Sequence, residues 1–270
     1  TEAAGIYFPG VSLGKGVAEF FQGAFAEAAR QLRDAVDNGW TADLQLPPEW
    51  TLPNDPRAAA FAHLVPTLVA LGDRAAAEQA ADEGLARAES LPYPIGPFSG
   101  QYVDSLLATA RSMDGDPVGA AEIGQRLVKV GDRHGFAIWS LSGRMHCLYS
   151  GIRLGDHSLL PAFAETVDAW HHVVAIDSWT PQWFADLGFA HLLVGDATSA
   201  LAAFDRSLQI AYANGSRFYE AEALRGRAQA KSALGRPGAL EDCRQALFVA
   251  ERQGAKLFAA RAHDALAVTA

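Results

Sequence analysis

Apolar side chains recur at intervals of three and four residues along most of the chain, which is the pattern of amphipathic helices. Residues 199–213 give a clear example, because Leu201, Phe204, Leu208 and Ala211 share one face of the predicted helix. Stretches of this kind alternate with short segments that contain Gly, Asp or Pro. The pattern therefore predicts an all-α protein made of successive helices joined by tight turns.

One short motif marks the turns: an apolar residue, then Gly and, in most copies, Asp. It occurs at Leu71-Gly72-Asp73, Gly115-Asp116, Leu154-Gly155-Asp156, Val194-Gly195-Asp196 and, with Arg in place of Asp, Leu234-Gly235-Arg236. From position 115 onward its glycines lie at 115, 155, 195 and 235, which is a constant step of 40 residues. Gly takes the left-handed conformation that ends a helix and Asp caps the next one, so each motif predicts the corner of a helical hairpin.

Other residues predict where hairpins begin and end. Helix stops are expected at Gly135, Asn214-Gly215 and Gly254, and helix starts at Asp55-Pro56, Asp116-Pro117 and Thr180-Pro181, where a capping residue precedes Pro. Residues 41–56 and 91–100 are rich in Pro and interrupt the period. Neither insertion is expected to be helical throughout, because Pro lacks the N–H that a helix interior needs.

The unit at residues 181–214 resembles the tetratricopeptide repeat signature. The signature positions are occupied by Phe184, Leu187, Gly188 and His191 before the corner, and by Ala200, Phe204 and Ser207 after it. We therefore predict a right-handed superhelix of about six tetratricopeptide-like hairpins, an α-solenoid. A single domain would span residues 1–270, with a degenerate first hairpin at 1–40, a Pro-rich insertion at 41–56, repeats at 57–254 and a terminal capping helix at 255–270.

Composition removes several classes of function. The chain has 31 acidic and 22 basic residues, a net charge of −9, and no basic block, so direct nucleic-acid binding is not expected. Its longest apolar run, residues 58–71, is too short to cross a bilayer and contains His63 and Pro66. Two separated cysteines, Cys147 and Cys243, and no recognisable leader segment indicate buried thiols in a reducing cytoplasm.

The motifs that suggest chemistry are weak. Residues 10–16 (Gly-Val-Ser-Leu-Gly-Lys-Gly) have three residues where a phosphate-binding loop has four, and no Ser or Thr follows the Lys. His171 and His172 are adjacent, and neighbouring side chains on a helix point about 100° apart, so a solvated helix end is favoured over a metal site. We expect no catalytic residue, metal or cofactor.

A superhelix of hairpins exposes a concave groove lined by the first helix of each repeat. The helical register places eight candidate binding residues there: Tyr102, Ser105, Tyr149, Gln182, Phe189, Glu222, Arg225 and Gln229. This mixture of aromatic and polar side chains suits recognition of a peptide or small molecule. The alternative for Glu222 and Arg225 is an exposed ion pair without a functional role.

Three segments resemble a more particular group, the C-terminal repeat region of bacterial multidomain signalling proteins. They are residues 216–225 (Ser-Arg-Phe-Tyr-Glu-Ala-Glu-Ala-Leu-Arg), 246–256 (Ala-Leu-Phe-Val-Ala-Glu-Arg-Gln-Gly-Ala-Lys) and 135–139 (Gly-Phe-Ala-Ile-Trp). Those proteins join a class III nucleotide cyclase or LuxR-type DNA-binding domain to a STAND-class ATPase and end in such repeats, as in the sensor arm of the maltose regulator. The similarity covers the chain from about residue 56 onward.

The resemblance implies a non-catalytic sensor or protein-interaction domain of a larger regulatory protein. Its partner would be a protein domain or peptide, with a small-molecule effector and a homodimer as further possibilities. The sequence shows no cyclase carboxylates, nucleotide-binding loop or helix-turn-helix, so those activities are not assigned to these residues. A structural spacer or oligomerisation module is the first alternative, and an enzyme is the weakest.

Overall fold

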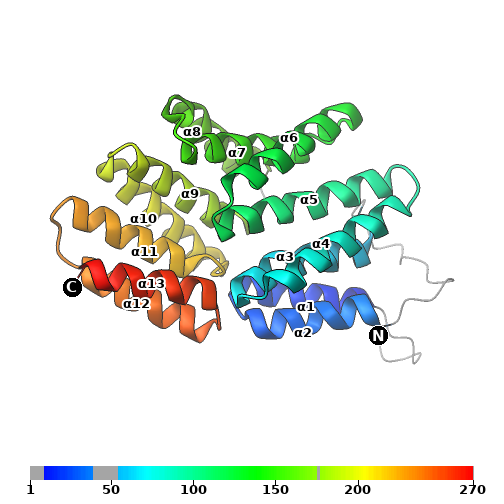
Figure 1. The fold of residues 1–270 in the computed structure, drawn as a ribbon, viewed down its shortest axis with the longest axis horizontal. Helices are drawn as coiled ribbons and strands as arrows, with labels where there is room; N and C mark the ends of the chain where they lie inside the picture. The colour runs from blue at the N-terminus through cyan, green and yellow to red at the C-terminus, as the bar shows by residue number, and fades with distance from the viewer. Residues whose placement is uncertain (1–8, 39–53, 175–176, 270) are drawn as a thin grey trace.

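The computed structural model describes residues 9–38, 54–174 and 177–269, and these residues form helices and turns with no β-strand (Figure 1). The α-helices are α1 (Pro9–Gln22), α2 (Phe25–Asp37), α3 (Pro56–Leu71), α4 (Arg74–Glu89), α5 (Ile95–Asp114), α6 (Pro117–His134), α7 (Ala137–Arg153), α8 (Leu160–Ala169), α9 (Thr180–Leu193), α10 (Ala197–Asn214), α11 (Glu220–Ala233), α12 (Ala239–Arg252) and α13 (Lys256–Thr269). Within this part of the chain they pack as six successive hairpins, α1/α2 to α11/α12, followed by α13. The predicted all-α stack of hairpins is confirmed.

The corners of the hairpins have the backbone that their sequence predicts. Gly195 has φ of 80° and ends the first helix of its hairpin, and the Asp196 carboxylate then accepts a hydrogen bond from the Ser199 N–H at 3.0 Å. A side chain at Gly195 would strain this left-handed conformation. Positive φ recurs at the other predicted corners and stops, Gly72, Gly115, Gly135, Gly155, Gly215, Gly235 and Gly254, and also at Gly23 between α1 and α2.

The start of α9 differs from the prediction. Thr180 is the first residue of the helix and not its cap, and Trp179 occupies the capping position without a side-chain hydrogen bond. The preceding helix is short, since α8 gives way at Trp170 to a π-helical turn that runs to Val174 (η3, Trp170–Val174). Trp179 packs against side chains of α1. The centroid of its ring lies 5.6 Å from that of Phe20 and 5.1 Å from that of Phe21.

The Pro-rich insertions are only partly described. In the second one, Ser90 to Pro94 form turns and α5 begins at Ile95, so helix resumes within the segment, with Pro97 in the first turn of α5. In the first one, Asn54 and Asp55 precede α3, and Asp55 caps it by accepting a hydrogen bond from the Ala58 N–H at 2.9 Å. Residues 39–53 lie outside the described part, so most of the predicted insertion at 41–56 does too.

The two ends of the stack meet. Figure 1 shows the C-terminal helices α12 and α13 beside α1 to α3. The rings of Phe20 and Phe218 lie 4.9 Å apart, and the Phe21 carbonyl accepts hydrogen bonds from the N–H groups of Arg217, at 2.6 Å, and Phe218, at 3.0 Å. The two ends of the expected groove are therefore in contact, and α5, α7, α9, α11 and α13 line an open cavity on its inner face. In the described residues, no helix is long and apolar enough to cross a membrane.

Close packing between neighbouring repeats depends on two glycines. The Phe204 ring of α10 lies between Gly188 of α9 and Gly226 of α11, and a Cβ atom added to Gly188 would lie 2.7 Å from the Phe204 Cζ atom. Gly188 occupies a position of the tetratricopeptide signature, and the structure shows that its close neighbour there is an aromatic ring. A Cβ atom at Gly226 would meet both Phe204 and Phe189.

We predict that Gly226→Ala lowers the free energy of unfolding by about 1–3 kcal/mol, because overpacking outweighs the better helix propensity of Ala. Urea denaturation followed by circular dichroism measures the change. Gly14→Ala is the matched control, since no heavy atom lies within 4 Å of a Cβ added to that exposed position of α1. It should raise stability by up to about 1 kcal/mol. Equal effects of the two substitutions would contradict this account of the packing.

Candidate functional site

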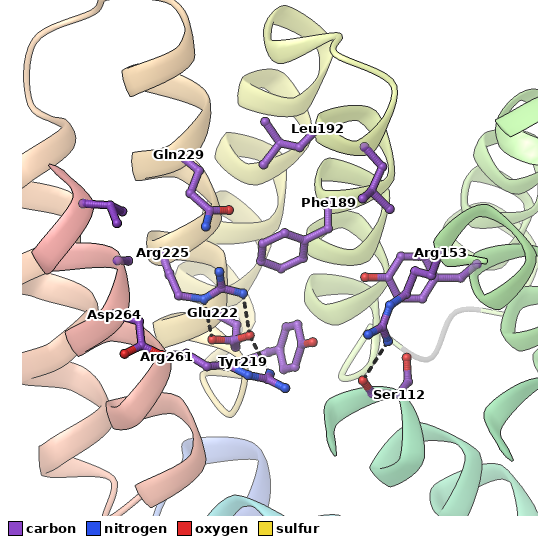
Figure 2. Close-up of a pocket in the computed structure, with 14 residues that line it drawn as sticks. Ser112, Arg153, Phe189, Leu192, Tyr219, Glu222, Arg225, Gln229, Arg261 and Asp264 are labelled. Atoms are coloured by element: carbon purple, nitrogen blue, oxygen red, sulfur yellow. Dashed lines mark hydrogen bonds and ion pairs between the residues drawn. The ribbon is translucent and has the colours of Figure 1, made fainter. Parts of the chain in front are cut away.

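A cavity of about 600 Å³ opens between α5, α7, α9, α11 and α13 (Figure 2). Because the first helices of successive repeats line it, it lies on the face where the groove was predicted. Its apolar side is formed by Phe189, Leu192 and Leu193, and its polar side by three arginines, Arg153, Arg225 and Arg261. Glu222 and Asp264 are the acidic residues in the lining.

Glu222 organises the polar side. Its carboxylate accepts hydrogen bonds from Arg225 Nε at 2.8 Å and Nη2 at 2.9 Å, and from Arg261 Nη1 at 3.0 Å. The Glu222 side chain is 2% exposed and that of Arg225 is 14% exposed, so the alternative of a surface ion pair is wrong. Burial disfavours the Glu222 charge, but the two guanidinium groups outweigh it and lower the pKa of the carboxyl.

The arginines are held in place by further contacts. The Arg225 guanidinium lies 4.7 Å from the centroid of the Phe189 ring, and Arg261 also donates to the Met113 carbonyl. Arg153 Nη1 donates to the Ser112 carbonyl at 3.0 Å, and its guanidinium lies 5.7 Å from the Tyr149 ring centroid. Among the residues described, no carboxylate lies within ion-pair distance of Arg153. Figure 2 shows these side chains around one space.

A second buried carboxyl lies behind this cavity. Asp186 of α9 accepts hydrogen bonds from the Tyr219 hydroxyl and from Gln182 Nε2, both at 3.3 Å. Burial raises its pKa to about 7, and the hydrogen bonds from Gln182 and Tyr219 with the charge of Arg153 offset only part of that effect. Asp186 is therefore the carboxyl of this site whose charge changes near neutral pH.

The structure separates the eight predicted site residues into three groups. Five of them line the cavity of Figure 2: Tyr149, Phe189, Glu222, Arg225 and Gln229. Tyr102 and Ser105 line a second, smaller cavity on the same inner face. Gln182 lines neither, because it is fully buried in α9 and bonded to Asp186.

Sequence reasoning missed Arg153 and Arg261. Arg153 follows Tyr149 by four residues on α7, so the register that selected Tyr149 was a signal that also pointed to it. No pattern in the sequence indicated that Arg261 lines the cavity, because α13 was predicted to be a terminal capping helix. It reaches the cavity because the ends of the stack meet.

The weak motifs have structural roles. Residues 10–16 lie within α1 and not in a loop. His171 and His172 lie in the π-helical turn, where His172 is exposed and its Nδ1 atom is 2.9 Å from the Asp168 carbonyl. No group of three or more His, Cys, Asp or Glu side chains with the geometry of a metal site occurs in the described ranges.

Comparison with known proteins gives a likeness in fold. A crystal structure of the apo form of RapI, a helical-repeat protein, superposes with a TM-score of 0.52 and 13% sequence identity over 97% of each chain. No protein-family model and no curated protein matches this sequence. The likeness supports a helical-repeat fold.

We predict that Glu222→Gln lowers the free energy of unfolding by about 3 kcal/mol or more. The substitution leaves two guanidinium groups without their shared carboxylate, and breaking a buried pair costs more than the pair itself contributes. Urea denaturation at pH 7 measures the loss. The control Glu241→Gln removes a side chain that is 61% exposed and should change stability by less than about 0.5 kcal/mol. Similar results for both variants would show that the Glu222 cluster is not buried as described.

The raised pKa of Asp186 predicts that the stability of the folded protein depends on pH. Its pKa is about 7 in the folded protein against an ordinary value of 3.8, so between these values the folded state holds a proton that the unfolded chain releases. The stabilising contribution of the protonated Asp186 carboxyl is therefore fully present below pH 3.8 and is lost as pH rises to 7. Over this range the free energy of unfolding falls by up to about 1.4 kcal/mol per pH unit.

Asp186→Asn removes this loss while keeping a hydrogen-bond acceptor for Tyr219. Its stability relative to the natural protein should increase from pH 5 to 7 and stay constant above that, in urea titrations at several pH values. Asp82→Asn, at an exposed position of α4, is the matched control and should show no such trend. A difference between Asp186→Asn and the natural protein that does not change with pH would mean that the Asp186 carboxyl does not titrate in this range.

Proposed function

We propose that this chain is a non-catalytic recognition module that binds a carboxylate-bearing peptide segment of a partner protein in the cavity of Figure 2. The observation that carries this proposal is the gathering of Arg153, Arg225 and Arg261 at one cavity of a protein whose net charge is −9. Guanidinium groups match carboxylates in shape and bind them through paired hydrogen bonds. An anionic ligand is thus the one that the cavity favours.

The charges of the lining leave capacity for a ligand. Arg225 and Arg261 share the carboxylate of Glu222, and the partners of Arg153 among the described residues are a carbonyl oxygen and an aromatic ring. A ligand carboxylate near Arg153 would gain a charge-assisted hydrogen bond in a partly desolvated place, where such bonds are stronger than in water. Arg153 is therefore the residue on which we expect the anion to dock.

The size and the apolar side of the cavity support a peptide. About 600 Å³ is typical of sites that enclose a drug-sized ligand, which corresponds to a few residues. Phe189, Leu192 and Leu193 offer an apolar surface beside the arginines, and an acidic segment with an apolar side chain would use both. Arginine clusters are a recurring means of recognising acidic motifs.

The wider role follows from the resemblance of the repeats to bacterial multidomain signalling proteins. We infer that the chain acts in the cytoplasm as the sensor or interaction arm of a larger regulator, whose output activity belongs to other domains. The alternative role, a spacer that forms homodimers, predicts association that depends on protein concentration and no binding in the cavity.

We predict that fluorescently labelled hexapeptides with a free C-terminal carboxylate and an acidic last residue bind more tightly than amidated, neutral versions. Arg153→Gln should weaken binding of the acidic peptides by about ten- to a hundredfold, the effect of losing one charged hydrogen bond. Fluorescence anisotropy at low salt measures both effects. Arg144→Gln is the matched control, since Arg144 lies on the same helix and is 59% exposed, paired with Asp132 at 3.8 Å.

The outcome that contradicts the proposal is equal binding of acidic and neutral peptides, or equal loss of binding in the two arginine variants. Sedimentation velocity on the same samples tests the alternative. A dimer that dissociates on dilution, together with no peptide binding, would favour the spacer.

A further inference from the structure

A second cavity, of about 240 Å³, lies on the inner face and shares no lining residue with the first. It is bounded by side chains of α1, α5, α7, the π-helical turn and the start of α9. Half of its lining residues are aromatic: Phe21, Phe98, Tyr102, Trp139, Trp170, Trp179 and Trp183. The Tyr102 and Trp139 rings are stacked, with centroids 5.3 Å apart.

Among the residues that the structure describes, no charged side chain lines this cavity. Placing an ion there would remove its hydration without supplying a partner of opposite charge, which is strongly unfavourable. The chemistry of the wall therefore selects a neutral, flat ligand that stacks on aromatic rings.

One strip of the wall is polar. The hydroxyl groups of Ser105 on α5 and Ser142 on α7 are 2.8 Å apart and form a hydrogen bond, and Thr109 lies one turn beyond Ser105. In such a pair one hydroxyl donates to the other, so the second hydroxyl keeps its own hydrogen. That hydrogen is available to an acceptor atom of a ligand.

The indole N–H groups of three tryptophans in the wall do not reach the cavity space. The Nε1 atoms of Trp139, Trp170 and Trp183 are buried and have no hydrogen-bond partner within the described residues. Because these atoms have almost no accessible surface, the tryptophans offer their rings to a ligand, and the hydroxyl groups of the polar strip offer the hydrogen bond.

We propose that this cavity binds a neutral bicyclic aromatic molecule that carries one hydrogen-bond acceptor. A cavity of about 150 Å³ lined by apolar side chains is known to hold benzene, so about 240 Å³ accommodates a second fused ring. The rings stack between the aromatic side chains, and the acceptor atom receives the free hydrogen of the Ser105–Ser142 pair. This site is independent of the anion site formed by the arginines.

Quinoline, naphthalene and tetramethylammonium are suitable probes, titrated into the full chain by calorimetry with tryptophan fluorescence as a second signal. Four of the six tryptophans of the chain line the cavity, so occupancy should change the emission. Quinoline is expected to bind about three- to tenfold more tightly than naphthalene, which lacks an acceptor. Removing both hydroxyls in Ser105→Ala/Ser142→Ala should lower quinoline affinity to that of naphthalene and leave naphthalene binding unchanged.

Two further variants separate loss of binding from loss of structure. Thr109→Leu fills the cavity and should abolish binding of both bicyclic probes while the far-ultraviolet circular dichroism stays unchanged. Arg153→Gln, in the other cavity, should bind quinoline as the natural protein does. Failure of quinoline to bind, equal affinity for quinoline and naphthalene, or tighter binding of tetramethylammonium would each overturn the proposal.

Discussion

The contact between the first hairpin and the last repeats governs the rest of this structure. A stack of hairpins buries one face of each repeat against the next and leaves two exposed end faces, which most such proteins must cover with polar caps. Here the end faces bury one another, through Phe20 against Phe218 and Phe25 against Phe258, with backbone hydrogen bonds to the Phe21 carbonyl beside them. As a result, helices from both ends of the chain contribute side chains to cavities on the concave side of the stack.

Two cavities with different linings lie on this inner face. Trp179, just before α9, packs against Phe21 of α1 and Phe218 near the start of α11 and lines the smaller cavity. Three arginines line the larger cavity, and half of the residues that line the smaller one are aromatic. The two cavities therefore differ in chemistry.

Burial also sets the electrostatics. Away from water, an ionised group is stable only beside a partner of opposite charge, and the buried side chains of Glu222, Asp186 and His63 follow this rule. Glu222 has two guanidinium groups and a lowered pKa, whereas burial raises the pKa of Asp186 and lowers that of His63 to about 4. The arginines keep their charge throughout, so the first cavity offers positive potential in a preformed arrangement.

The sequence by itself determined the helices, their corners and the order of the hairpins, because capping by Asp196 and the left-handed conformation of Gly195 depend on residues close in the chain. Helical register also placed Phe189, Glu222 and Arg225 on the inner face. Only the tertiary structure decided that the ends meet, that Gln182 is buried, and that Arg261 of the last helix joins Glu222 across 39 residues. The periodicity of the sequence indicates which face of each helix is apolar. Whether the two ends of the stack meet depends on the sum of small rotations between successive repeats, and no local sequence pattern predicts that sum.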